Sequence, residues 1–229
     1  MNTLIYFLQK TIGQKIVVGL TGLGLALFLL IHMIGNLFIL SGPAAYNRYA
    51  YKLHELPIFF LLEIGLLLVF LGHILLSLLL QIKNKKARGE TEYKLKAKGD
   101  KKTDLAHRFL WFQGIILLLF LAFHLISFKF GPIYETQLDG KTVRNIYQLV
   151  MENFKKPLYT IGYTCILGIL FVHLFRGLPA SFKSLGLSNP FYLSLIKTLS
   201  ISLSIIIVVG FLAPIWYIFI YYNFLIFYI

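Results

Sequence analysis

The sequence predicts an all-α integral membrane protein, a helical bundle with five transmembrane helices, and three observations lead to this. Hydrophobic residues make up 58% of the 229 residues, and the mean hydropathy is +0.78. A soluble domain has about 45–50% apolar residues. The apolar residues lie in five long blocks, and the 22 Lys and Arg residues lie mostly between or at the ends of these blocks. We therefore expect residues 1–229 to form a single membrane domain.

The five expected spans cover about residues 15–40, 57–82, 105–130, 157–178 and 191–220. Each is long enough to cross hydrocarbon about 30 Å thick, which takes about 20 helical residues. Pro57 and Pro157 are expected as first helical residues, where a missing N–H costs nothing. Asp104 is expected to cap the third span. The first apolar run exceeds the ~7–15 residues of a cleaved signal peptide, so we expect it to be retained.

The segments between the spans differ in character. Residues 41–56 form a link rich in turn residues, and 131–156 is expected to hold a short amphipathic helix around Val143–Phe154. Residues 83–108 carry ten Lys or Arg and four acidic residues, which suits either a solvated loop or a docking surface. The last span is expected to kink at Pro214 and, from Trp216 onward, to turn along the interface as an aromatic belt.

The basic residues predict the orientation of the chain. With the N-terminus inside, 15 of the 22 Lys and Arg lie on the inner side and 7 on the outer side. Because basic residues are retained in the cytoplasm, we expect a cytoplasmic N-terminus and an external C-terminus. The net charge of +13 then reflects topology and contacts with membrane lipids, and no nucleic acid is expected as a partner. The single cysteine, Cys165, excludes an internal disulfide and the Cys pair of a c-type haem attachment.

Each of the first four spans contains one histidine late in its length: His32, His73, His124 and His173. A histidine inside a membrane usually has a function. Because successive spans alternate in direction, His32 and His124 are expected toward the outer face, and His73 and His173 toward the inner face. Each level then has two imidazoles on different helices, as bis-histidine ligation of a b-type haem requires. From the helical rise, the levels should be roughly 10–18 Å apart.

Other interpretations of the histidines are weaker. A proton relay would need several carboxylates at depth, and the spans contain only Glu63. Zinc prefers ligands gathered at one level, with Cys or carboxylate among them. A lone histidine can simply bond a neighbouring helix, but that does not account for two pairs. His54 and His107 fall outside the pattern and are expected at the membrane interface. Three glycines lie roughly on the histidine faces and suit either a macrocycle or ordinary helix packing: Gly35, Gly162 and Gly177.

These residues resemble the single-chain, five-helix, di-haem cytochrome b subunit that anchors bacterial succinate dehydrogenases and fumarate reductases. The resemblance covers about residues 10–210. Its most specific parts, besides His73 and His124, are Thr21-Gly22, the segments 32–37, 42–49 and 173–177, and the segment 181–186. In that family the first and third helices hold one haem, and the second and fourth hold the other.

The resemblance implies a three-subunit complex in the bacterial cytoplasmic membrane. A flavoprotein and an iron–sulfur protein would dock on the cytoplasmic face and carry out the succinate/fumarate chemistry. This chain would pass electrons between the iron–sulfur subunit and menaquinone or another quinone through two haems b. Many relatives have His or Trp-His after the fourth ligand, where this chain has Phe175-Arg176. Arg176 and Lys183 are therefore candidates for bonding the propionates of the inner haem.

A quinone site needs a proton acceptor near a haem edge, with access to water. Glu55 and Glu63 are the candidates on the outer side. By its position 23 residues after His32, Glu55 better resembles the acidic residue implicated in menaquinone-reactive relatives. Alternatively, Glu55 only pairs with Arg48 or Lys52.

Two other functions remain open from the sequence. One is the cytochrome b of another membrane dehydrogenase, such as a hydrogenase. The other is a haem-free transporter of small solutes. Inverted repeats would favour a transporter, but the first two spans and the next two share only the position of the histidine.

Overall fold

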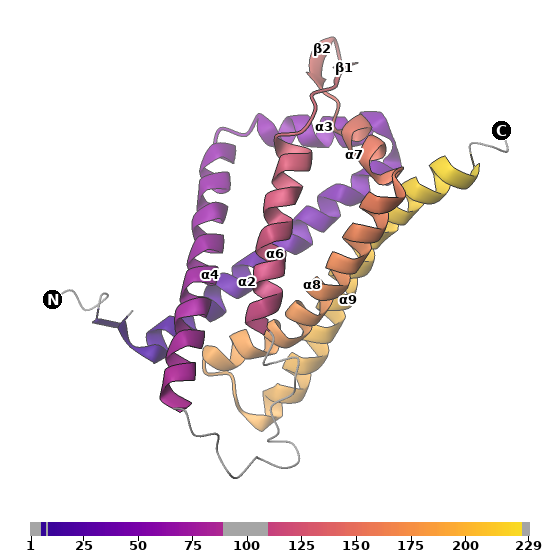
Figure 1. The fold of residues 1–229 in the computed structure, drawn as a ribbon. Helices are drawn as coiled ribbons and strands as arrows, with labels where there is room; N and C mark the ends of the chain where they lie inside the picture. Colours follow the sequence, from indigo (N-terminus) through magenta and orange to yellow (C-terminus); the bar gives the residue numbers. More distant parts are fainter. Residues whose placement is uncertain (1–5, 8, 89–109, 226–229) are drawn as a thin grey trace.

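A computed structural model describes residues 6–7, 9–88 and 110–225. Long helices form a bundle in which consecutive helices run in opposite directions (Figure 1). They are α2 (Thr11–Leu37), α4 (Phe59–Arg88), α6 (Leu110–His124), α8 (Pro157–Ser184) and α9 (Pro190–Ile220). A short turn extends three of them: η1 (Phe38–Ser41) after α2, and the π turns η3 (Leu125–Lys129) and η4 (Tyr221–Leu225) after α6 and α9.

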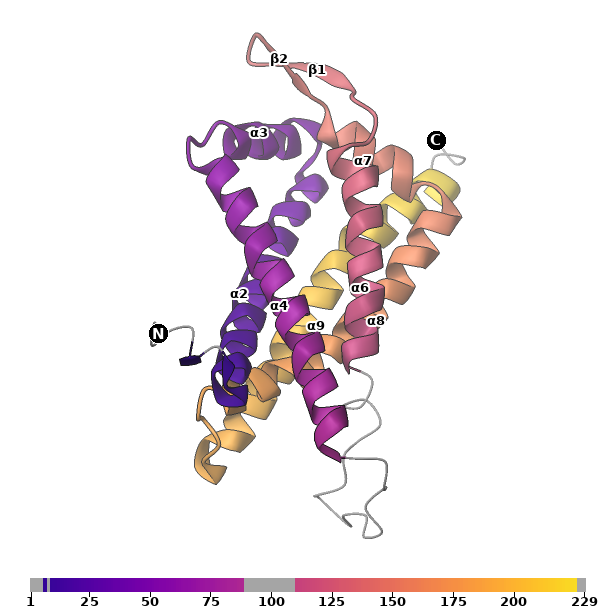
Figure 2. The same cartoon turned by 60° about the vertical axis from the view of Figure 1, so that its left-hand side comes forward.

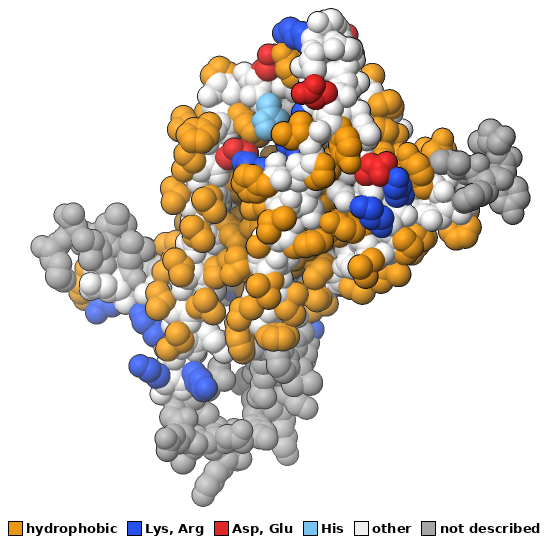
Figure 3. Space-filling model, turned by 45° about the horizontal axis from the view of Figure 1, so that its top comes forward, with side chains coloured by type: hydrophobic (Ala, Val, Ile, Leu, Met, Phe, Trp, Pro, Cys, Tyr) orange, Lys and Arg blue, Asp and Glu red, His pale blue; other side chains and the backbone are white. Residues whose placement is uncertain are grey.

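Five helical segments of the described chain are long and apolar enough to cross a membrane. Leu, Ile, Val and Phe surround these helices on every side, as is typical of helices that face lipid. A helix also satisfies its own backbone hydrogen bonds, which hydrocarbon cannot do. Hydrophobic side chains cover the visible helices, and acidic and basic side chains gather toward the two ends (Figure 3). The chain thus has the helices of a multi-pass membrane protein.

The packed part of the bundle consists of α2, α8 and α9. Ala26, Leu174, Leu178 and Ile207 join these three helices in one buried cluster, and Ile207 is fully buried. Helix α4 packs mainly on α2, and α6 mainly on α8. Figure 2 shows α6 running beside α8 and α4 crossing α2.

One end of the bundle, called the hairpin end here, carries small elements. Helix α3 (Pro43–His54) lies across it, close to helix α7 (Ile146–Phe154) (Figure 1). Strands β1 (Glu135–Leu138) and β2 (Lys141–Arg144) form an antiparallel hairpin. Its two-residue turn has positive φ at Asp139 (51°) and Gly140 (76°), as a tight hairpin turn requires. The opposite end is where α2 begins and where α4 and α8 end.

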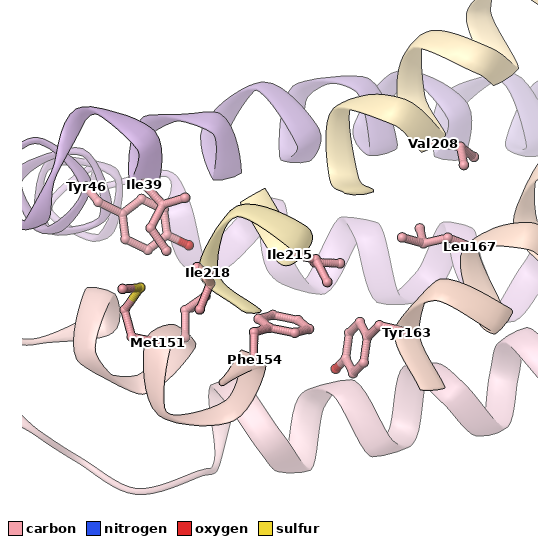
Figure 4. Packing of buried hydrophobic residues seen from close by; sticks show 10 residues of the cluster. Ile39, Tyr46, Met151, Phe154, Tyr163, Leu167, Val208, Ile215 and Ile218 are labelled. Atoms are coloured by element: carbon pink, nitrogen blue, oxygen red, sulfur yellow. The ribbon is translucent and has the colours of Figure 1, made fainter. Parts of the chain in front are cut away.

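A second buried cluster fastens these small elements to the bundle (Figure 4). Tyr46 of α3 and Met151 and Phe154 of α7 pack with Tyr163 of α8 and Ile218 of α9. Since these residues come from four elements, the hairpin end is folded onto the helices and not merely connected to them.

The structure corrects two expectations about the links. Residues 41–56 were expected as turns, but Pro43–His54 are helical, because Gly42 adopts a φ of 96° and Pro43 starts the helix. The amphipathic helix expected around Val143–Phe154 begins only at Ile146, where the Asn145 side chain caps it by accepting from the backbone N–H of Gln148. Val143 and Arg144 belong to β2, and the hairpin itself was not expected.

The bounds of the spans also differ from expectation. Pro157 begins α8 as expected, but Pro57 lies in a turn, and α4 begins at Phe59. Helix α4 continues to Arg88, into the segment expected as a loop, and α8 continues to Ser184 through Pro179. Asp104, His107 and the rest of that segment, residues 89–109, lie outside the described residues.

The last span stays helical past Pro214. Helix α9 continues through Pro214 and Trp216 to Ile220, and η4 carries the helical path on to Leu225. Pro214 is buried, and a proline is tolerated inside a membrane helix where neighbouring helices compensate for its missing hydrogen bond. The chain is thus helical through Leu225, and its course along the interface stays a prediction.

Candidate functional site

The four span histidines come from four different helices, and all four are partly buried. His32 of α2 and His124 of α6 face each other near the hairpin end. Their ring centroids are 6.0 Å apart, and the ring planes are at 89°. A metal–imidazole nitrogen bond is about 2.0–2.1 Å long, so two imidazoles on opposite sides of one ion have centroids about 6 Å apart. The spacing of this pair therefore suits one metal ion held between two imidazoles.

His73 of α4 and His173 of α8 form the second pair. Each ring lies next to a glycine of a neighbouring helix. A β-carbon added to Gly22 of α2 would lie 3.1 Å from Cε1 of His73, and one added to Gly114 of α6 would lie 4.0 Å from Cε1 of His173. The small residues Gly22 and Gly114 thus leave room beside this pair.

The two pairs lie at different depths, and two helices give the same separation. Along α2, His32 follows Gly22 by ten residues, and along α6, His124 follows Gly114 by ten residues. Ten residues of α-helix rise about 15 Å. The levels are therefore about 15 Å apart along the bundle.

Thr21 of α2 contacts the His73 ring. Its hydroxyl donates to the carbonyl oxygen of Val17 at 2.7 Å and lies 3.1 Å from Nδ1 of His73. A hydroxyl has a single hydrogen, so a Thr21 hydroxyl that donates to Val17 is able to accept from Nδ1–H of His73. Nε2 of His73 then carries the lone pair that a metal would need.

The hairpin-end pair has a partner on each ring. The Tyr163 hydroxyl lies 3.2 Å from Nδ1 of His124. The side-chain nitrogen of Asn36 donates to the carbonyl oxygen of His32 at 2.8 Å and lies 3.4 Å from Nε2 of the same residue, at the long limit of a hydrogen bond. A metal at Nε2 of His32 would replace only this longer contact. At the other level, Nδ1 of His173 is buried without a hydrogen-bond partner among the described residues.

These residues would hold a metal ion by two imidazoles and not by three or more protein ligands. Within residues 6–7, 9–88 and 110–225, no three His, Cys, Asp or Glu side chains are gathered as a zinc site would need. The helices that provide His73 and His124 are also poorly covered by protein. In the described part of α6 no residue is buried, and over residues 59–87 of α4 only Leu80 is. His73 and His124 thus lie on helices that other parts of the protein cover little.

No family model, curated protein or solved structure matches this chain.

The two candidates for bonding the haem propionates, Arg176 and Lys183, lie at different distances from His173. Arg176 is partly buried on α8, one turn past His173, with its guanidinium carbon 4.8 Å from the ring centroid of Phe175. Lys183 is exposed near the end of α8, ten residues from His173. Ten residues correspond to about 15 Å, so Arg176 is the nearer cation to the His73–His173 level.

The two acidic candidates lie in different surroundings. Glu55 is exposed at the end of α3, where it accepts a hydrogen bond from Tyr51 and lies 4.0 Å from Nζ of Lys141. Neither Arg48 nor Lys52 is its partner in the structure; Arg48 pairs with Asp139. Glu63 is partly buried on α4 and forms an ion pair with Lys129, five residues after His124. Glu63 is thus tied to the helix that holds a hairpin-end histidine.

The remaining sequence candidates have ordinary surroundings. Gly35 packs against the ring of Tyr49, which explains its small size without a cofactor. No atom lies within 4 Å of a β-carbon added to Gly162 or Gly177. His54 of α3 is exposed, but its ring packs on Phe59 with centroids 4.4 Å apart, and this partial loss of water lowers its pKa.

Sequence reasoning missed the partners of the ring nitrogens. Thr21 was noted only as part of a resemblance, and Tyr163 not at all. Thr21 precedes His32 by eleven residues, three helical turns, so it lies on the same face of α2. That spacing was the available signal. Tyr163 precedes His173, the histidine of its own helix, by ten residues. This spacing is not a whole number of helical turns, so it is a weaker signal.

Proposed function

We propose that this chain is the membrane-anchor cytochrome b subunit of a bacterial succinate:quinone oxidoreductase, a succinate dehydrogenase or fumarate reductase. One observation carries the proposal: four helices present two pairs of imidazoles at two levels about 15 Å apart. His32 and His124 would hold one haem b, and His73 and His173 the other. Two axial imidazoles leave no open position for oxygen and favour electron transfer.

A bound haem at each level would take up and release one electron at a time. The chain's own part is to hold the two irons at fixed depths and to keep water from them. The apolar helices supply the low-dielectric surroundings, and Thr21 and Tyr163 hold two of the rings. Arg176 is placed to neutralise acidic groups at the His73–His173 level.

The quinone would react near the hairpin end, with Glu63 or Glu55 as proton acceptor. The hairpin end has both acidic and basic side chains at its surface (Figure 3). The flavoprotein and iron–sulfur subunits would dock at the opposite end, where the exposed residues Lys10, Lys15, Lys85 and Lys86 lie. The charge pattern supports this end as the cytoplasmic one.

A difference spectrum tests the haem part of the proposal. Membranes containing the chain should show a b-type α-band on reduction, with two haems per chain. His32→Ala or His124→Ala should remove one spectral component, and His73→Ala or His173→Ala the other. His54→Ala is the matched control and should remove neither. If His32→Ala and His73→Ala removed the same component, the pairing would be wrong, and a chain without any b-type band would fit a transporter instead.

A second experiment tests the choice of dehydrogenase. The tagged chain should co-purify from its native membranes with a flavoprotein that oxidises succinate or reduces fumarate. Co-purification with a hydrogenase would reassign the same haem geometry to another membrane dehydrogenase.

A further inference from the structure

The partners of the histidine rings are exchanged between the two levels. Helix α2 provides His32 to the hairpin-end pair, while its Thr21 bonds His73 of the other pair. Helix α8 provides His173 to that other pair, while its Tyr163 bonds His124 at the hairpin end. Each of these two helices therefore acts at both levels, once through an imidazole and once through a hydroxyl.

The ring partners lie on packed helices, and the rings that they hold lie on open ones. Helices α2 and α8 belong to the buried cluster around Ile207. Helices α4 and α6, which provide His73 and His124, have almost no buried residues. A ring on a poorly covered helix has few neighbours to fix its orientation, so a hydroxyl from a packed helix contributes much of that constraint.

Both hydroxyls are themselves held in place. Thr21 is fixed by its bond to the Val17 carbonyl, within its own helix. Tyr163 is 6% exposed, and its ring packs edge-on against Phe154 and Phe120, with centroids 4.9 and 5.0 Å apart. Neither side chain can follow a rotating imidazole without losing these contacts.

We propose that Thr21 and Tyr163 are matched positioning residues, each of which fixes the ring and the Nδ1 hydrogen of one iron ligand and so sets the reduction potential of the haem at its own level. The inference rests on the proposed function. When Nε2 of a histidine binds iron, Nδ1 carries a hydrogen and needs an acceptor. An oxygen that accepts this hydrogen makes the imidazole a more basic ligand.

The direction of the effect follows from charge. A more basic ligand stabilises ferric iron, which has the larger positive charge, more than ferrous iron. Thr21 and Tyr163 therefore lower the reduction potential of the haem that each one serves, and loss of either hydroxyl should raise that potential.

The test is a redox titration of the purified chain carrying its haems. Thr21→Val and Tyr163→Phe remove each hydroxyl with little change in shape. The two haems are first assigned to their levels with two variants. The haem lost in His73→Ala belongs to the His73–His173 level, and the haem lost in His124→Ala belongs to the His32–His124 level. Thr21→Val should raise the midpoint potential of the His73–His173 haem only, and Tyr163→Phe that of the His32–His124 haem only. Thr21→Ser, which keeps a hydroxyl, should restore the parent value.

Two control variants remove neighbouring hydroxyls that touch no histidine. The Tyr159 hydroxyl lies 3.3 Å from that of Ser127, and the Thr164 hydroxyl donates to the carbonyl of Thr160. Tyr159→Phe and Thr164→Val should leave both potentials unchanged. If Thr21→Val and Tyr163→Phe moved neither potential, or moved both potentials equally, the inference would be overturned while the haem assignment stood. If the parent chain held no haem, the proposed function would fail first and take the inference with it.

If Tyr163→Phe lost its haem by failing to fold, Thr21→Val and its Thr21→Ser rescue would still decide the inference. A shift confined to one haem supports it, and no shift refutes it.

Discussion

Asn47 and Asn145 bond each other across 98 residues of sequence and join α3 to the start of α7. The side-chain nitrogen of Asn47 donates to Oδ1 of Asn145 at 2.9 Å. Oδ1 of Asn47 in turn accepts from the backbone N–H of Tyr147 at 2.9 Å. Asn47 is only 2% exposed. Its side-chain amide therefore provides hydrogen-bond partners for polar groups that are shielded from water. Through these bonds the link between the first two spans is attached to the link before the fourth span.

We expect Asn47→Ala to destabilise the hairpin end. The substitution leaves the N–H of Tyr147 and the side chain of Asn145 without their buried partner, which costs about 1–3 kcal/mol. Thermal unfolding of the protein in detergent should show the loss as a lower midpoint. Asn189→Ala is the control, since Asn189 caps α9 at an exposed position. Equal losses in the two variants would show that burial of Asn47 does not matter.

The ion pair between Arg48 and Asp139 should matter far less than Asn47. Arg48 donates three hydrogen bonds to Asp139, two from Nη2 at 2.8 and 2.9 Å and one from Nε at 3.2 Å, but the two side chains are 46% and 69% exposed. Exposed pairs contribute about 0–1 kcal/mol, because water screens the charges. Asp139→Asn should therefore leave the unfolding midpoint nearly unchanged, and asparagine also tolerates the positive φ at this position. A loss as large as that of Asn47→Ala would contradict this.

The spans could be predicted from the sequence because hydrocarbon imposes a simple rule. Long apolar blocks must be helices there, since their backbone has no other partners. The first and last residues of the spans were harder to predict, as Pro57 and Pro157 show. Both prolines precede apolar runs, but only Pro157 starts a helix, whereas Pro57 lies in the turn before Phe59. Proline permits a helix start, and the neighbouring fold decides whether the helix begins there.

The hairpin end was mostly missed because distant contacts shape it. The segment 43–54 is short and mixes polar with apolar residues, so it has no clear helical pattern. Its helix is stabilised by Asn47 and Tyr46, whose hydrogen-bond partners lie elsewhere in the chain. The hairpin did carry a local signal, the dipeptide Asp139-Gly140, which favours a two-residue turn. At the site, histidine depth followed from helix direction, but the contact between Tyr163 and His124 depends on how α8 packs on α6.

Gly22 should control the space beside His73. A β-carbon at Gly22 would lie 3.1 Å from both Cε1 of His73 and Oγ of Ser181, so each must give way by a few tenths of an ångström. We expect Gly22→Ala to weaken, and Gly22→Val nearly to abolish, haem binding at the His73–His173 level, while the hairpin-end haem stays. The difference spectrum measures both. Gly24 is the control, because no atom lies within 4 Å of a β-carbon there, and Gly24→Ala should keep both haems.

If the chain reacts with a quinone as proposed, comparing Glu63→Gln with Glu55→Gln identifies the acidic residue that serves it. The resemblance favours Glu55, but the structure gives reasons to expect Glu63. Its carboxylate is partly buried and paired with Lys129, five residues past His124, whereas Glu55 is exposed at the end of α3. A proton acceptor must lie within hydrogen-bond reach of the quinol, which dissolves in the apolar region and not in water.

Glutamine keeps the size of either side chain and removes its ability to take up a proton. Loss of a general base typically slows a reaction about 10²–10⁴-fold. Glu63→Gln should therefore reduce quinone-linked turnover of the complex by at least about tenfold, while both haems stay reducible by dithionite. Glu55→Gln should change turnover little, since its partners Tyr51 and Lys141 are at the surface. The opposite result, with Glu55→Gln slow and Glu63→Gln normal, would assign the quinone to α3 and leave Glu63 with only its ion pair to Lys129.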